Sequence, residues 1–210
     1  MNLISHRGNN DHNYRENSKE ALLNVLNVYY IEGIEFDIRI TKDKEIIINH
    51  NKNILEKDPL VCDLTLKEIK DYSIKGVDIA TLEEFLKEVN SEKKLIIEIK
   101  EERDNFEICA LLDNILKKYP LNYYICSFNY ALILHMKNNY NYKCGLLIGK
   151  EANLGREYKE FDFLSIYYKH IKRYKNANQL LCTWTVNNNK DLKNIPKDCL
   201  IITNTAYLFK

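Results

Sequence analysis

Residues 33–40 read Gly-Ile-Glu-Phe-Asp-Ile-Arg-Ile, and this stretch decides the fold because apolar and charged side chains alternate along it. A period of two is typical of a β-strand, in which residues i and i+2 project from the same face. Ile34, Phe36 and Ile38 share one face, which we expect to pack against helices. Glu35 and Asp37 project together from the other face, so two carboxylates occupy one small volume.

Further apolar runs lie on both sides of this strand and alternate with longer amphipathic stretches, a pattern typical of parallel strands covered by helices. The expected strands are Asn2–Ser5, Gly33–Ile40, Lys94–Lys100, Tyr123–Ser127, Lys143–Ile148, Phe161–Ile166, Leu180–Val186 and Cys199–Thr203. The expected helices are Ser18–Tyr30, Thr81–Asn90, Asn105–Tyr119, Tyr130–Asn139, Tyr168–Asn176 and Lys190–Ile195. Eight strand-then-helix units predict an α/β fold, a (β/α)8 TIM barrel. It must be compact, because 210 residues is short for this architecture.

Local signals refine this prediction. Ser18 is expected to cap one helix, and Thr81 with Glu84 forms the capping-box pattern at the start of another. Residues Glu45–Asn49 predict a short extra strand, which forms a β-hairpin with the second strand. The region Asn51–Asp78 is then a small insertion, which we expect to cover one end of the barrel. Because no Gly/Pro/Ser-rich linker divides the chain, residues 1–210 are predicted to form a single domain.

The charge balance restricts the choice of partners. Lysine and arginine number 31 and aspartate and glutamate 30, so the chain has no general attraction for nucleic acid or anionic membranes. An anionic substrate must therefore be captured locally. The N-terminus lacks the pattern of a signal peptide, and no apolar run approaches about 18 residues. We expect a cytoplasmic protein with no membrane anchor and no nucleic-acid partner, while the oligomeric state is not indicated.

Six cysteines are scattered singly, mostly in apolar surroundings where a thiol acts as a small hydrophobic group. They are Cys62, Cys109, Cys126, Cys144, Cys182 and Cys199. Because no CxxC pair is present, we expect free and mostly buried thiols. A disulfide framework or a zinc site is the alternative.

Carboxylates on two expected strands indicate a cation site. Glu35 and Asp37 would repel each other unless a divalent cation holds both ionised, although solvated charges on an open strand face would also explain them. Glu98 and Lys100 share one face of a strand that should be buried on both sides. Their simpler explanation is a mutual salt bridge; the alternative makes Glu98 a third oxygen ligand and Lys100 a cation for a phosphate. Three carboxylates favour Mg²⁺ or Ca²⁺ over zinc.

Two histidines stand at strand ends close to these carboxylates. His6 ends the first expected strand and His50 follows the extra one. An isolated histidine is usually structural, but two beside a cation site suit a base and an acid that exchange roles near neutral pH. Arg7 suits bidentate phosphate recognition, with a surface charge as the alternative. Gly8 would let the backbone turn sharply after His6.

The chain resembles the glycerophosphodiester phosphodiesterase family along nearly its whole length. The resemblance rests on six blocks in order: Ile4-Ser5-His6-Arg7-Gly8 with Glu16-Asn17-Ser18, Gly33–Lys42 with His50, Thr81–Glu84, Ile96–Lys100, Ser127–Asn129 and Trp184–Asn187. It implies metal-dependent hydrolysis of small glycerophosphodiesters to glycerol 3-phosphate and an alcohol. By resemblance, His6 and His50 are catalytic, Glu35, Asp37 and Glu98 bind the metal, Arg7 and Lys100 hold the phosphate, and Phe128 and Trp184 line the alcohol side.

Two positions and one region depart from the family pattern. Asn204 stands where the family usually has aspartate, Asn51 stands where aspartate is common, and the region Asn51–Asp78 is shorter than usual. Two alternatives to the implied activity remain open. One is a lysophospholipase D-like phosphodiesterase, which a broad apolar mouth would indicate. The other is a catalytically silent barrel that binds glycerol phosphates.

Overall fold

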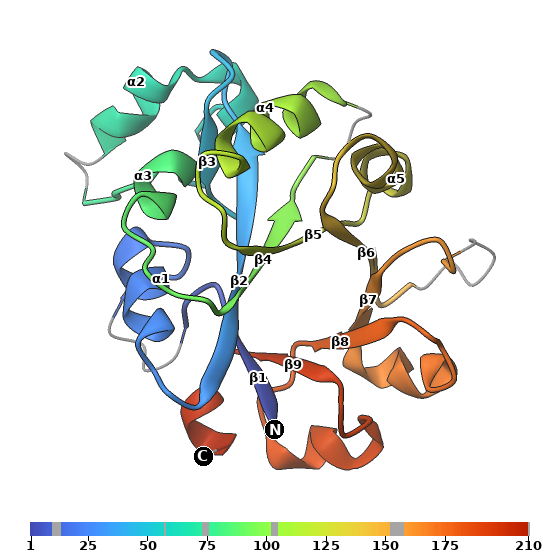
Figure 1. Ribbon diagram of the computed structural model, residues 1–210. Coiled ribbons are helices and arrows are strands. Elements are labelled where there is room, and N and C mark those ends of the chain that lie inside the picture. The colour runs from blue at the N-terminus through green and yellow to red at the C-terminus, as the bar shows by residue number, and fades with distance from the viewer. Residues whose placement is uncertain (10–13, 57, 73–75, 102–104, 152–157, 210) are drawn as a thin grey trace.

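The computed structural model describes residues 1–9, 14–56, 58–72, 76–101, 105–151 and 158–209. Eight parallel strands form a closed ring with helices outside it, so the predicted TIM barrel is confirmed (Figure 1). The strands are β1 (Asn2–His6), β2 (Ile31–Ile40), β4 (Lys94–Ile99), β5 (Asn122–Ser127), β6 (Lys143–Ile148), β7 (Phe163–Tyr167), β8 (Leu180–Trp184) and β9 (Leu200–Thr203). Pairing of β1 with both β9 and β2 closes the ring.

The outer layer consists of short helices. The α-helices are α1 (Lys19–Leu26), α3 (Leu82–Leu86), α4 (Glu107–Leu116) and α5 (Tyr130–Asn139). The expected caps are present, because the Ser18 side chain accepts a hydrogen bond from the Ala21 amide and Thr81 forms a capping box with Glu84.

The last part of the chain uses 3₁₀ helices: η3 (Tyr168–Tyr174), η4 (Asn189–Asn194) and η5 (Ala206–Phe209). The first two lie where the sequence predicted helices at Tyr168–Asn176 and Lys190–Ile195. A 3₁₀ helix rises about 2.0 Å per residue, against 1.5 Å for an α-helix, so fewer residues connect consecutive strands of this compact barrel.

The predicted hairpin is present, and the insertion packs against it. β3 (Ile46–Ile48) pairs antiparallel with the end of β2. The insertion contains η1 (Val61–Asp63) and α2 (Leu66–Lys70). A small apolar core joins it to β3: Ile47, Ile54, Val61, Ile69, Tyr72 and Ile79. Most of the described part of the insertion lies beside the barrel in Figure 1 rather than over its opening, contrary to our expectation, because this core attaches it to the hairpin.

Alternation along the strands produces two apolar layers. Ile34, Phe36 and Ile38 pack outward against the helices, as predicted. A smaller cluster that includes Ile96 and Phe163 fills the barrel interior. All six cysteines are free, and Cys62 alone among them is exposed. No helix in the described ranges has the length and apolar character needed to cross a membrane.

Close packing of the barrel interior depends on Gly145 in β6. A Cβ atom at this position would lie 2.5 Å from the Phe163 ring, which is fully buried. Gly145→Ala is therefore expected to lower the free energy of unfolding by about 1–3 kcal/mol through overpacking. Gly149→Ala is the control, because its Cβ would meet only the exposed Phe128 ring, at 3.3 Å. Urea unfolding checks both variants, and equal stability of the two would contradict the expectation.

Candidate active site

One pocket opens at the carboxyl ends of the strands, where TIM barrels place their active sites. It has a volume of about 210 Å³ and is lined by His6, Arg7, Glu35, His50, Glu98, Lys100, Cys126, Phe128, Leu147, Ser165, Trp184, Thr185 and Ile202. Eight of the nine site residues that the sequence predicts are in this lining. The ninth, Asp37, forms ion pairs with Arg7 and Lys100 and thus lies directly beside the pocket.

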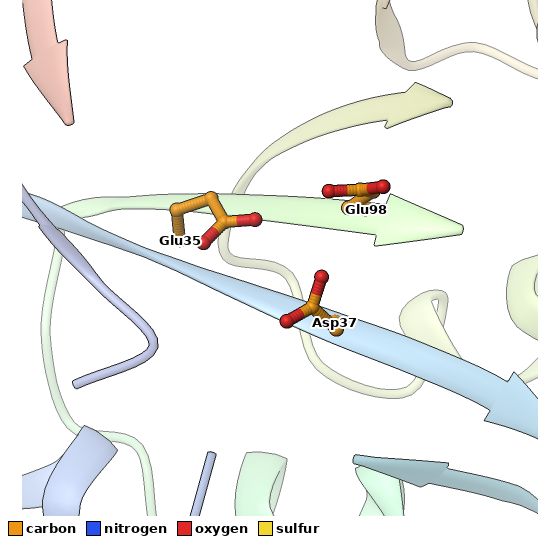
Figure 2. Close-up of side chains that lie close together, drawn as sticks. All are labelled: Glu35, Asp37 and Glu98. Carbon is orange, nitrogen blue, oxygen red and sulfur yellow. The ribbon is translucent and has the colours of Figure 1, made fainter. Parts of the chain in front are cut away.

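Three buried carboxylates gather on neighbouring strands. Glu35 and Asp37 come from β2, and Asp37 is paired in register with Glu98 of β4. The three carboxyl groups lie close together beside these two strands (Figure 2). One oxygen from each residue lies within 4.8 Å of the other two. Relative exposures of 5%, 0% and 7% exclude the solvated-charge alternative for Glu35 and Asp37 and show that Glu98 is buried with them.

The proximity of these carboxylates perturbs their ionisation. Burial raises the pKa of Glu35 well above its ordinary value, and the charges of Asp37 and Glu98 raise it further. Burial also raises the pKa of Glu98 to about 7, against the opposing effect of Lys100. Burial acts in the same direction on Asp37, but Lys100 and Arg7 outweigh it and lower that pKa. Without a bound cation, the cluster therefore retains protons that free carboxylates would lose near neutral pH.

Two basic side chains balance the cluster. Lys100 Nζ lies 2.6 Å from Glu98 Oε1 and 3.2 Å from Asp37 Oδ1. The salt bridge between Glu98 and Lys100, which was the simpler explanation of these two residues in the sequence, is therefore present. Arg7 Nε lies 3.0 Å from Asp37 Oδ2, and Arg7 Nη1 lies 2.9 Å from Glu16 Oε1. Arg7 is thus largely buried and ion-paired, which excludes the alternative of a surface charge.

The donor set fits a hard divalent cation. Glu35 Oε2, Asp37 Oδ1 and Glu98 Oε1 are buried and receive no hydrogen bond of good geometry from any residue that the structure describes, although Lys100 lies at ion-pair distance from the last two. Two oxygens bound to one Mg²⁺ or Ca²⁺ lie up to about 4–5 Å apart, which matches the spacing of this cluster. Acceptors that are buried without a hydrogen bond are costly, and a bound cation would remove that cost.

His6 is fixed at the end of β1. Its Nδ1 lies 2.6 Å from Asn204 Oδ1, and its Nε2 lies 3.7 Å from Glu35 Oε2. Burial and the charge of Arg7 lower the pKa of His6 to about 4, although the hydrogen bond that the ring makes to Asn204 acts in the opposite direction. At position 204, where the family usually has aspartate, this chain thus contacts His6 through a neutral amide.

The chain turns tightly after His6. Arg7 and Gly8 both adopt positive φ, 57° and 71°, so the backbone leaves the strand at once. A Cβ at Gly8 would lie 2.8 Å from backbone atoms of α1, so a larger residue has no room there.

His50 is held from the other side of the pocket. Its Nδ1 lies 2.9 Å from Asn51 Oδ1, and burial lowers its pKa. Its carbonyl accepts hydrogen bonds from Arg39 Nε and Nη2, at 3.0 and 2.8 Å. Arg39 Nη1 also donates to the Lys100 carbonyl at 2.8 Å. One guanidinium therefore ties the backbones that carry His50 and Lys100.

The remaining predicted residues form the aromatic part of the lining. The rings of Phe128 and Trp184 meet edge to face with centroids 5.8 Å apart. Lys100 Nζ lies 5.9 Å from the centroid of the Phe128 ring. Beyond them, the pocket continues into a groove of about 840 Å³, whose lining includes Arg39, Lys52 and Glu101. Charged groups thus stand along the exit from the pocket.

The sequence prediction did not include two positioning residues. Asn17 donates from Nδ2 to Asp37 Oδ2 at 2.8 Å, and its Oδ1 accepts from the Asp37 amide at 3.3 Å. The other residue is Arg39. Both residues lie inside the sequence blocks that resemble the family. Arg39 also follows Glu35 and Asp37 at a spacing of two, so the sequence already placed it on the same face of the strand as the two carboxylates.

The other histidines lie apart from the pocket. His135 stacks on Phe106, and His170 Nε2 contacts the carbonyl of Lys150. His12 lies outside the described residues. Only His6 and His50 among the described histidines therefore line the pocket.

Comparisons with known proteins agree with this arrangement. The profile of the Glycerophosphoryl diester phosphodiesterase family matches residues 6–205. A glycerophosphodiester phosphodiesterase of Caldanaerobacter subterraneus subsp. tengcongensis is 27% identical over 219 residues, covering 93% of this chain and 89% of the relative. The crystal structure of a glycerophosphodiester phosphodiesterase from Thermotoga maritima matches with a TM-score of 0.79 and 25% identity, covering 99% of this chain and 96% of that chain.

The structure of an Oleispira antarctica phosphodiesterase, solved with the product sn-glycerol-3-phosphate, matches with a TM-score of 0.80 over 97% of this chain and 93% of that chain. At 20% identity this likeness concerns the fold. The family profile, in contrast, spans nearly the whole chain. The chain therefore belongs to the Glycerophosphoryl diester phosphodiesterase family and is a phosphoric diester hydrolase.

Proposed function

We propose that residues 1–210 form one domain that hydrolyses small glycerophosphodiesters to glycerol 3-phosphate and an alcohol, with Mg²⁺ or Ca²⁺ bound by Glu35, Asp37 and Glu98. The observation that carries the proposal is the convergence of three buried carboxylates and two histidines on one pocket. When bound, the cation would stabilise negative charge on the phosphate oxygens as a Lewis acid. A cytoplasmic location stays a prediction from the sequence.

The side chains around the cluster have complementary roles in this proposal. One histidine removes the proton of the attacking oxygen, which belongs to water or to a glycerol hydroxyl of the substrate, and the other protonates the leaving alcohol. Arg7 and Lys100 stabilise the charge that develops on the phosphate. Phe128 and Trp184 contact the carbon chain of the alcohol side. The ion pairs of Arg7 and Lys100 with Asp37 support these roles, because they hold both cations beside the proposed metal ligands.

The groove outside the pocket favours this substrate class over a lysophospholipid. A lysophospholipase D would need a broad apolar mouth for an acyl chain. Phe128 is the exposed large apolar residue of the groove, whereas Arg39, Lys52 and Glu101 supply charged groups to its lining. We therefore expect greater activity on glycerophosphodiesters than on their acylated counterparts.

The histidine roles are tested by replacing each ring separately. His6→Ala and His50→Ala should each lower the turnover of glycerophosphocholine with Mg²⁺ or Ca²⁺ by about 100-fold or more, because general acid–base catalysis supplies that much. The measurement is release of glycerol 3-phosphate. His135→Ala is the matched control on α5 and should retain full turnover. Unchanged turnover in both pocket variants would refute the assignment and favour another catalytic arrangement.

The metal proposal is tested separately from catalysis. Exhaustive chelation should abolish turnover of the wild-type protein, and added Mg²⁺ or Ca²⁺ should restore it. Glu98→Gln should weaken metal binding measured by titration calorimetry by at least about 10-fold, because it replaces an anionic ligand with a neutral one. Asp113→Asn is the control, since Asp113 is a buried carboxylate on α4, outside the pocket lining. Full activity of the chelated wild-type protein would exclude a required cation.

A further inference from the structure

Both pocket histidines have an asparagine amide oxygen at the same ring nitrogen. Asn204 Oδ1 lies 2.6 Å from His6 Nδ1, and Asn51 Oδ1 lies 2.9 Å from His50 Nδ1. An amide oxygen only accepts hydrogen bonds, so Nδ1 of each neutral ring must carry the hydrogen. The unprotonated nitrogen of each ring is then Nε2. In His6 this atom lies toward Glu35 and the carboxylate cluster, at 3.7 Å from Glu35 Oε2.

The partner of His6 is itself held in place. Asn187 Oδ1 accepts a hydrogen bond from the Asn204 backbone amide at 2.9 Å. Thr205 Oγ1 donates to the Asn187 carbonyl at 3.0 Å, which fixes the segment after β8 against the segment after β9. A relay of contacts thus runs from Asn187 through Asn204 to His6, and joins residues that are 198 positions apart in the chain.

The partner of His50 is held less firmly. Asn51 is the next residue in the chain and is exposed, so its contact spans one peptide unit at the rim of the pocket. The His50 backbone has its own support from Arg39, which donates two hydrogen bonds to the His50 carbonyl. Because Asn51 is exposed, we expect it to restrain the ring of His50 less than Asn204 restrains the ring of His6.

We propose that Asn204 is a positioning residue that fixes His6 in the Nδ1–H tautomer and presents Nε2 as the nitrogen that exchanges protons with the substrate, with Asn187 holding Asn204. This inference rests on the proposed function for its catalytic consequence, but not for the tautomer itself. In water the Nε2–H tautomer of a free imidazole side chain is readily available, and it would direct a hydrogen toward the carboxylate cluster. The amide oxygen of Asn204 selects against that form.

The tautomer gives a test that is independent of turnover. Nitrogen-15 NMR of the imidazole rings should show His6 of the wild-type protein protonated on Nδ1 and unprotonated on Nε2. In Asn204→Ala the His6 signals should move toward the Nε2–H form. Asn204→Asp retains an oxygen acceptor at the same place and should keep the Nδ1–H form. A wild-type His6 that is protonated on Nε2 would overturn the proposal, whether or not the protein hydrolyses any phosphodiester.

Kinetics supply the second readout. Asn204→Ala should lower kcat for glycerophosphocholine by about 10- to 100-fold with KM changed less than about 3-fold, because a partner that orients a functional side chain typically contributes that much. Asn51→Ala should lower kcat by less than about 5-fold, and Asn187→Ala should fall between these two. Asn204→Asp should recover most of the activity. Asn139→Ala is the matched control, because Asn139 Nδ2 contacts the ring of His135, outside the pocket.

Each outcome of these experiments is informative. Thermal unfolding and circular dichroism identify a variant that fails to fold. If Asn204→Ala fails to fold, Asn187→Ala carries the kinetic test, because its expected loss of kcat also arises from release of Asn204. Loss of kcat in Asn204→Ala without a change in the His6 tautomer would overturn the positioning role. If the wild-type protein hydrolyses no glycerophosphodiester, the proposed function fails, while the NMR result still decides whether Asn204 fixes the ring of His6.

Discussion

The site depends on one constraint: three carboxylates are buried together with two basic side chains, those of Arg7 and Lys100, at the mouth of the barrel. Removing charged groups from water is costly, and mutual attraction offsets this only with good geometry and further hydrogen bonds. Lys100 bridges Glu98 and Asp37, and Arg7 contacts Asp37 from the opposite side. Among the described residues, Glu35 forms no ion pair with a lysine or an arginine, and its Oε2 lies 3.7 Å from His6 Nε2. This imbalance is the physical reason to expect a further positive charge in the cluster.

The barrel supplies the rigidity that such a cluster needs. β2 and β4 are paired in register, and the outward residues of β2 are fully buried under the helices, so Glu35 and Asp37 cannot turn away from the interior. Asn17 and Arg39 then restrict the groups around the cluster. Asn17 makes two hydrogen bonds to Asp37, and Arg39 joins the backbones at His50 and Lys100. Side chains held by packing and by surrounding hydrogen bonds are those best suited to catalysis and metal binding.

Much of this arrangement could be predicted from the sequence. Apolar and charged side chains alternate along residues 33–40, and this pattern predicts both the strand and the face that carries the carboxylates. The capping pattern at Thr81 was equally local and was confirmed. The two 3₁₀ helices and the position of the insertion were not predicted, since both depend on how much space the closed barrel leaves. The contact of Asn204 with His6 joins residues near the two ends of the chain, so only the departure of position 204 from a family pattern drew attention to it. Nothing in the local sequence of Arg39 indicated two backbone carbonyls as its partners.

The position of a bound cation tests the role of the carboxylate cluster most directly. Crystals grown with Mn²⁺, which prefers oxygen ligands as Mg²⁺ and Ca²⁺ do, would locate the ion by its anomalous scattering. If the cluster is the cation site, one peak lies at bonding distance from oxygens of Glu35, Asp37 and Glu98, and Lys100 has moved away from at least one of its carboxylate partners. A cluster without a peak, in which Lys100 keeps both ion pairs while the ion binds elsewhere, would contradict that role.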